Sequence, residues 1–202
     1  ATWSSCSPDF GIRGVLDRFG QIAPKVLFTA DGYCYGGKTL DSIERIAGIL
    51  ESLPSVASVV VVANGSQRPD LARLPAARRY EEFGEPDATP RFERLPFDHP
   101  LYILYSSGTT GVPKCIVHGA GGTLLQHLKE HQLHSDVHPG ERLFFFTTTG
   151  WMMWNFLVSS LLSDVVPVLY DGNPAWPDGD LLWKMVQDAK VNLFGASPTY
   201  QS

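Results

Sequence analysis

One stretch of the chain, residues 56–63, limits the fold most tightly, because all but one of its residues are apolar and it is rich in β-branched side chains. It reads Val-Ala-Ser-Val-Val-Val-Val-Ala, so neither face of a strand formed from it would be suited to water. A helical pattern that ends at Pro54 precedes it, and another apolar run, 26–30, lies before that helix. Strands separated by helices predict an α/β fold with mostly parallel sheets and covering helices.

The same alternation continues along the chain. We expect helices near residues 12–22, 43–53, 121–136 and 181–189, and further strands at 101–105, 115–118, 142–146, 165–170 and 191–195. In the third helix, four leucines should face inward: Leu124, Leu125, Leu128 and Leu133. Three histidines should lie on a solvated or half-buried face: His127, His131 and His134. The histidines are not arranged as a metal site.

Prolines recur between residues 64 and 100, where basic and acidic side chains are mixed. This composition predicts a surface connection with at most one short helix. We therefore divide the chain into a first α/β segment (1–70), a surface connection (71–100) and a segment that carries the two most informative motifs (101–202).

The first motif is a run of small residues, 106–111, which follows the apolar strand 101–105. Gly108 and Gly111 allow backbone N–H groups to turn towards one anion. Pro113 stiffens the exit, and Lys114 adds a positive charge on a long stem. Hydroxyl donors complete a loop suited to polyphosphate, and they belong to Ser106, Ser107, Thr109 and Thr110. From composition alone, a hairpin without a ligand is the alternative.

The order Tyr-Ser-Ser-Gly-Thr-Thr-Gly-Val-Pro-Lys, residues 105–114, closely resembles the signature loop of the acyl-adenylate-forming enzymes. This superfamily includes acyl-CoA synthetases, luciferases and peptide-synthetase adenylation domains. The resemblance implies that the loop binds the β- and γ-phosphates of ATP while a carboxylate attacks the α-phosphate and pyrophosphate leaves. It implies Lys114 and Thr110 as catalytic candidates, with Thr110 also helping to hold Mg²⁺ between the phosphates.

A glycine turn, Tyr35-Gly36-Gly37-Lys38, lies earlier in the chain. A flexible loop with a solvated lysine is the structural interpretation. In relatives of the acetyl-CoA synthetase type, a similarly placed basic-Gly-Gly-basic turn lies where the nucleotide end of CoA binds. The resemblance implies that Gly36, Gly37 and Lys38 bind CoA, although Tyr35 replaces the first basic residue.

The second motif, residues 147–156, joins three threonines and a glycine to Trp-Met-Met-Trp-Asn-Phe. Such residues are typical of a buried helix face, and they also suit a small apolar pocket with one polar group. The stretch resembles the acyl-pocket motif of the acetoacetyl-CoA synthetases, and the resemblance continues through 165–174. It implies a pocket in which Asn155 donates a hydrogen bond to a 3-keto oxygen, and the implied lining is Trp151, Met152, Met153, Trp154 and Asn155.

Trp154 stands where acetyl-CoA synthetases have glycine, which argues against acetate. We therefore expect the full-length parent to ligate acetoacetate to CoA through an acetoacetyl-adenylate, with ATP converted to AMP and pyrophosphate. The resemblance runs from about residue 6 to the end and covers part of the family's N-terminal domain, without the C-terminal domain. We expect this piece to be inactive alone. A ligase for acetate or propionate and a non-catalytic nucleotide-binding module are the alternatives.

Charge and cysteine content narrow the partners. The formal net charge of −5 argues against nucleic acid, because no basic stripe is present to displace counterions. No run reaches the roughly 18 apolar residues of a membrane helix, and the first residues do not resemble a secretory signal. Cys6, Cys34 and Cys115 have no paired spacing, which favours a reducing compartment. We expect a cytoplasmic protein whose partners are small-molecule substrates.

Overall fold

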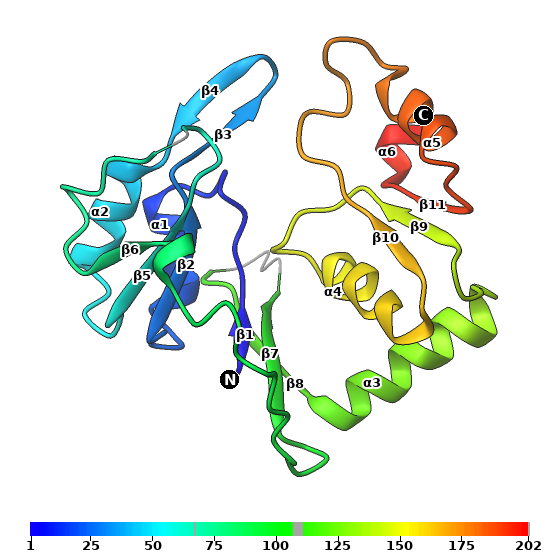
Figure 1. Ribbon diagram of the computed structural model, residues 1–202, viewed down its shortest axis with the longest axis horizontal. Coiled ribbons are helices and arrows are strands. Elements are labelled where there is room, and N and C mark those ends of the chain that lie inside the picture. The colour runs from blue at the N-terminus through cyan, green and yellow to red at the C-terminus, as the bar shows by residue number, and fades with distance from the viewer. Residues whose placement is uncertain (67, 107–110, 202) are drawn as a thin grey trace. The chain divides into compact units, whose positions relative to one another are not determined.

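The computed structural model describes residues 1–66, 68–106 and 111–201, and the chain forms two compact units (Figure 1). The β5 unit consists of Pro8–Arg94 and Tyr105–Cys115. The β9 unit consists of Ala1–Ser7, Leu95–Leu104 and Ile116–Ser202. In the part of the chain that is described, no helix has the length and apolar character needed to cross a membrane.

A parallel sheet in the order β2–β5–β6 forms the centre of the β5 unit. Its strands are β2 (Val26–Ala30), β5 (Ser58–Val62) and β6 (Ala77–Arg79). The side chains of Val59, Val60 and Val61 are at most 2% exposed, which accounts for a strand that is apolar on both faces. The helices of this unit are α1 (Ile12–Phe19), α2 (Ile43–Glu51) and the 3₁₀ turn η1 (Tyr80–Glu82). The predicted parallel strands at 26–30 and 56–63 are thus confirmed.

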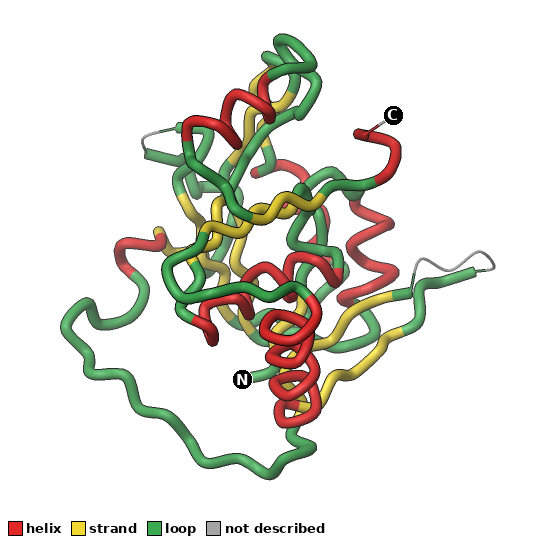
Figure 2. Tube along the Cα trace, turned by 90° about the vertical axis from the view of Figure 1, so that its right-hand side faces the viewer, coloured by secondary structure: helices red, strands yellow, loops and turns green. Residues whose placement is uncertain are grey.

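An antiparallel hairpin follows β2, and it pairs β3 (Gly32–Tyr35) with β4 (Lys38–Asp41). Its two-residue turn is formed by Gly36 and Gly37, with φ of 55° and 76°. Both values lie in the left-handed region, which glycine adopts without steric cost and which a two-residue hairpin turn requires. The sequence predicted the turn but not its flanking strands, and it did not predict β6. From residue 83 to 99, between η1 and β7, the chain is loop throughout (Figure 2).

Two sheets belong to the β9 unit. The first has the order β1–β7–β8, and its strands are β1 (Trp3–Ser4), β7 (Pro100–Tyr105) and β8 (Cys115–Gly119). The second is parallel with the order β10–β9–β11, and its strands are β10 (Val166–Val168), β9 (Arg142–Phe145) and β11 (Leu193–Gly195). A core of Val137, Leu143, Leu157 and Val165 packs against this second sheet, and each is at most 7% exposed. The strands predicted in this half of the chain are all present, although some are shorter.

The helices of the β9 unit are α3 (Ala120–Lys129), α4 (Met152–Ser159), α5 (Leu181–Asp188) and α6 (Pro198–Gln201). A π-helical turn, η2 (Glu130–His134), continues α3, and a 3₁₀ turn, η3 (Ser160–Ser163), continues α4. α3 and η2 together fill the helix predicted at 121–136. The predicted helix at 181–189 is confirmed as α5.

The prediction that the leucines of α3 and η2 face inward, with the histidines on a solvated or half-buried face, is wrong. The side chains of Leu124, Leu125 and Leu133 are 41%, 60% and 76% exposed, while His127 is 8% and His131 is 0% exposed. The side of α3 and η2 that faces α4 meets polar groups there, and the imidazoles hydrogen-bond to them. A buried histidine is tolerated when its ring nitrogens find partners, so hydrogen bonding here outweighs the apolar pattern.

Candidate functional site

The base of the predicted phosphate loop is closed by a reciprocal pair of hydrogen bonds between the ends of β7 and β8. The Ser106 N–H donates to the Lys114 carbonyl at 3.0 Å, and the Lys114 N–H donates to Ser106 Oγ at 3.0 Å. The Ser106 oxygen therefore acts as an acceptor towards Lys114 and keeps its own hydrogen for another acceptor. Figure 2 shows the two strands as neighbouring segments that lead to and from the loop.

The loop itself is only partly described. The predicted phosphate ligands Ser107, Gly108, Thr109 and Thr110 lie outside the described residues. Gly111 has φ of 109°, and a Cβ there would meet no atom of the described residues within 4 Å. Backbone conformation, rather than lack of space, therefore requires glycine at this position. The Lys114 side chain is exposed at the base of the loop, where it is free to follow a bound anion.

Helix α1 supports the loop base from within the β5 unit. The Gln21 side chain, just after α1, donates from Nε2 to the Pro113 carbonyl at 2.8 Å and to the Asp17 carbonyl at 2.6 Å. The Arg18 guanidinium lies 5.8 Å from the centre of the Tyr105 ring, a distance at which a cation is attracted by an aromatic face. Both ends of the loop, Tyr105 and Pro113, are thus in contact with this helical segment. The sequence did not predict Gln21 and Arg18 as supports of the loop, because neither of these two residues belongs to a motif.

The second predicted motif begins at a tightly packed turn. Ser5 donates a hydrogen bond to the Thr149 carbonyl. A Cβ on Gly150 would lie only 3.1 Å from the backbone nitrogen of Ser7, closer than most real Cβ contacts. Glycine at this position therefore lets the N-terminal segment pass directly over the turn that precedes α4.

Side chains at the start of α4 point in different directions, because successive helical residues are rotated by about 100°. Trp151 and Met152 are exposed, whereas Met153 and Asn155 are half-buried. Trp154 packs against the core formed by Val137, Leu143, Leu157 and Val165. The Asn155 Nδ2 lies 3.5 Å from the Trp151 carbonyl oxygen, which is long for a hydrogen bond, so this contact is weak. That these residues share one acyl pocket remains a prediction.

Behind α4 lies a buried polar cluster that we call the histidine cluster: His127, His131, Phe156 and Ser159. Ser159 Oγ is 2.7 Å from His127 Nδ1 and 2.9 Å from His131 Nε2. His131 Nε2 also lies 3.0 Å from the Phe156 carbonyl, and its ring stacks on the Phe156 ring with centres 4.1 Å apart.

Burial sets the protonation of the histidine cluster. It lowers the pKa of both His127 and His131, because the charged imidazolium would lose its hydration. For His127, the nearby His131 and His118 lower the pKa further, and Glu130 opposes them. Both rings are therefore neutral near pH 7. In the described part of the chain, no group of three histidine, cysteine or carboxylate side chains is arranged to hold a metal ion.

The predicted CoA residues lie at the tip of the β3–β4 hairpin. Lys38 is exposed there, and so is Tyr35, which pairs with it across the turn. The backbone of Gly36 and Gly37 closes the turn between them. The tip thus presents one cation and one aromatic ring to solvent. The assignment itself remains a prediction.

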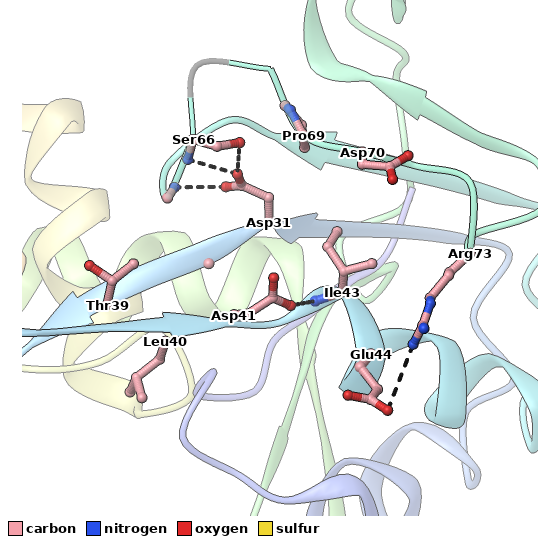
Figure 3. A pocket seen from close by; sticks show the side chains of 12 residues that line it. Asp31, Thr39, Leu40, Asp41, Ile43, Glu44, Ser66, Pro69, Asp70 and Arg73 are labelled. Carbon is pink, nitrogen blue, oxygen red and sulfur yellow. Dashed lines mark hydrogen bonds and ion pairs between the residues drawn. The ribbon is translucent and has the colours of Figure 1, made fainter.

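A pocket of about 430 Å³ lies beside β4 in the same unit (Figure 3). Asp31, 6% exposed, ties its wall together, because its carboxylate accepts hydrogen bonds from the backbone N–H groups of Asn64, Gly65 and Ser66 at 2.7 to 2.8 Å. The Ser66 hydroxyl donates a fourth bond at 2.6 Å. Burial alone would raise the pKa of Asp31, but these four hydrogen bonds together lower it.

The remaining carboxylates of this pocket also have partners within the chain. Asp41 accepts from the Ile43 N–H, Asp70 accepts from the Ala72 N–H, and Glu44 lies 3.7 Å from Arg73 (Figure 3). The lining is acidic, so it is not suited to the phosphates of CoA. Asp31 holds the loop of residues 64–66 in place, so its carboxylate is already occupied by groups of the protein. Its sequence signal was present but not used: an aspartate directly after an apolar strand and directly before glycine.

Three comparisons place the chain among known proteins. It matches the family described as AMP-binding enzyme over residues 1–201. An acetoacetyl-CoA synthetase from Danio rerio is 47% identical over 96% of the chain and 30% of the relative. An acetoacetyl-coenzyme A synthetase from Rhizobium meliloti (strain 1021) is 52% identical over 99% of the chain and 31% of the relative.

Two further relatives refine this comparison. A malonamoyl-CoA synthetase from Penicillium aethiopicum is 45% identical over 100% of the chain and 30% of the relative. The solved structure of an acetoacetyl-CoA synthetase from Streptomyces lividans matches with a TM-score of 0.92 and 49% identity, over 99% of this chain and 30% of that one. The chain therefore spans about 30% of the length of these relatives.

Proposed function

Because the chain belongs to the AMP-binding enzyme family, we propose that it is the phosphate-binding and acid-binding part of an acid–thiol ligase whose acid is acetoacetate. The observation that carries this proposal is the match to the acetoacetyl-CoA synthetase of Streptomyces lividans, which extends over 99% of the chain at 49% identity. Curated relatives of the same name from an animal and a bacterium support it.

In the first half reaction, a carboxylate oxygen of the acid attacks the α-phosphorus of ATP. The bond to the bridging oxygen breaks, and pyrophosphate leaves with growing negative charge. Gly111 and Lys114 act here, since turned backbone N–H groups and a cation stabilise such charge best when they are already in place. The hydrogen bonds between Ser106 and Lys114 hold the loop base, and the Ser106 hydroxyl hydrogen remains available to a phosphate oxygen.

In the second half reaction, the CoA thiol sulfur attacks the acyl carbon of the adenylate, the acyl–oxygen bond breaks and AMP leaves. We assign Lys38, at the hairpin tip, to a phosphate of the CoA nucleotide. Mg²⁺ accompanies ATP and offsets the charge of its phosphates. The hydroxyl assigned to it, Thr110, lies outside the described residues. A cytoplasmic location and the small-molecule partners stay predictions from the sequence.

Malonamate is a second candidate acid, favoured by the relative named malonamoyl-CoA synthetase. Acetoacetate and malonamate both carry a carbonyl group two atoms from the carboxylate, and they differ by a methyl against an amino group. A donor placed for one of these carbonyl oxygens therefore serves the other. Acetate and butyrate lack this oxygen, so a panel of the four acids separates the chemistry of the pocket from its size.

The test is acid-dependent exchange of pyrophosphate into ATP by the full-length protein, measured with acetoacetate, malonamate, acetate and butyrate. Acetoacetate should give the fastest exchange. Lys114→Ala should slow it by about 100-fold, as expected for loss of one group that stabilises developing charge.

Lys38→Ala is the matched control, because CoA takes no part in the exchange assay. It should leave exchange unchanged and raise the KM for CoA in the complete reaction. Exchange that is absent with all four acids would refute the ligase. If exchange were fastest with malonamate, the proposed acid would change from acetoacetate to malonamate, and the proposed ligase reaction would stand.

A further inference from the structure

The histidine cluster joins α4 to the helical segment behind it by a fixed set of hydrogen bonds. The Phe156 carbonyl can only accept, so the hydrogen of His131 must be on Nε2. Ser159 donates its hydroxyl hydrogen to the same carbonyl at 2.7 Å. The Ser159 oxygen then accepts from His127 Nδ1, which fixes the hydrogen of His127 as well.

This arrangement leaves one nitrogen without use. Within the described residues, His131 Nδ1 is buried and has no hydrogen-bond partner. A neutral ring bears only a lone pair at this atom, which costs less to bury than a second N–H group would. His131 thus presents one donor to α4 and one apolar face to the Phe156 ring, and it does not serve as a link to any further residue described.

These bonds control the rotation of α4 about its axis. Phe156 is the residue next to Asn155, and Ser159 is four residues beyond Asn155, about 6 Å along the helix at 1.5 Å per residue. α3 packs against α4 within one unit (Figure 1), and His127 and His131 are 8% and 0% exposed. A helix held at two successive turns cannot rotate without breaking these bonds. The direction of Met153 and Asn155 is therefore fixed from behind.

The backbone that carries His131 is unusual in the same place. Residues Glu130–His134 form a π-helical turn, and the Ser135 N–H bonds to the Glu130 carbonyl at 2.9 Å. Such turns are rare and are found frequently at functional sites. His134, in the same turn, is exposed and pairs with Glu130 at 3.0 Å, so it provides an internal comparison.

We propose that His127 and His131 are positioning residues that set acid selectivity by fixing the rotation of α4 beneath Met153 and Asn155. This inference rests on the proposed function, because it assigns the start of α4 to the acyl pocket. The two histidines do not touch the acid. They act through the Phe156 carbonyl and the Ser159 hydroxyl, and the acid is recognised by residues at the start of the same helix.

The test compares acetoacetate with butyrate in the exchange assay on the full-length protein, as the ratio of the two kcat/KM values. His131→Leu should lower this ratio by about tenfold, because a small displacement of a recognition group is costly. The KM for ATP should change by less than about twofold. His131→Gln keeps a donor for the Phe156 carbonyl and should restore most of the ratio. His134→Leu, the same change on the exposed side of the turn, should leave it unaltered.

An unchanged ratio in His131→Leu would overturn the inference. An equal fall in kcat/KM for both acids together with weaker use of ATP would also overturn it, because that pattern indicates general damage to the protein. If that variant does not fold, Ser159→Ala is judged by the same ratio. Wild-type protein that uses another acid in place of acetoacetate would refute the proposed substrate alone, and the ratio is then measured with that acid. Wild-type protein without exchange would refute both.

Discussion

The base of the phosphate loop and helix α4 both follow strands and both carry predicted ligand residues, yet they are held differently. Exposed groups and main-chain atoms support the loop, through Gln21 and the pair Ser106 and Lys114. Buried imidazoles, His127 and His131, support α4. A helix that must discriminate between similar acids needs its geometry fixed before the acid arrives.

The largest expected difference between the two regions appears on acidification. The folded state lowers the pKa of His127 and His131 below 6.5, so their contribution is complete above about pH 6.5 and is lost as the pH falls below it. Among the described residues, no titratable side chain takes part in the hydrogen bonds of Gln21 and Ser106. Hydrogen–deuterium exchange of the full-length protein, corrected for intrinsic rates, should therefore show α4 opening at pH 5.5 while residues 105, 106 and 111–115 stay unchanged.

A double variant, His127→Gln with His131→Gln, is the control for this titration, because glutamine does not bind a proton in this range. Its α4 should exchange at the same corrected rate at pH 7 and pH 5.5. Equal opening of both regions in the wild type would show that acid acts elsewhere, and the comparison between them would fail.

An intermediate effect is expected at the front of α4. Asn155→Ala should reduce the preference for acetoacetate over butyrate by about fivefold to tenfold, the effect of losing one hydrogen bond to substrate. Asn155→Asp keeps the shape of the side chain but removes the donor, so it should show a similar loss. The ratio of kcat/KM values for the two acids is the measurement. A preference that survives both changes would remove Asn155 from the pocket.

The smallest effect is expected at the loop base. Gln21→Ala removes one partly exposed hydrogen bond to Pro113, for which about 0.5 to 1 kcal/mol is typical. The KM for ATP in the exchange assay should rise by about threefold or less. Gln187→Ala, an exposed glutamine on α5, serves as the control. If Gln21→Ala slowed pyrophosphate exchange as much as Lys114→Ala does, the loop base would be as rigidly held as α4. The difference between the two regions would then not exist.

The sequence predicted the helices and strands better than the contacts that hold the candidate site from behind. Residues 26–30 are β2 as predicted, because β-branched and apolar residues between clear breakers leave few alternatives. The inward face of α3 was mispredicted, because Leu124, Leu125 and Leu133 carry the stronger apolar signal than His127 and His131. The partners that make the histidines suitable for burial lie 25 to 32 residues later, and local periodicity contains no trace of them.

The candidate site shows the same limit. Gly111 was predicted to allow the backbone to turn, and its φ of 109° is a turn that favours glycine. Gln21 was not predicted, since a glutamine after a helix has no local feature that sets it apart. Residues that face a ligand recur in recognisable order because the ligand is constant. Residues that hold them from behind are recognised only once the fold shows what they contact.

Asp31 also bears on the order of assembly. Its carboxylate binds the amides of residues 64–66, which are 33 to 35 positions away, and the Asp31 N–H bonds to the Val62 carbonyl at the end of β5. These bonds need β2 and β5 to be paired first, so the loop after β5 closes only when the central sheet has formed. Contacts so distant in sequence close a long loop, and closing that loop costs chain entropy. A single acidic side chain thus makes closure of the neighbouring loop depend on pairing of the two strands before it.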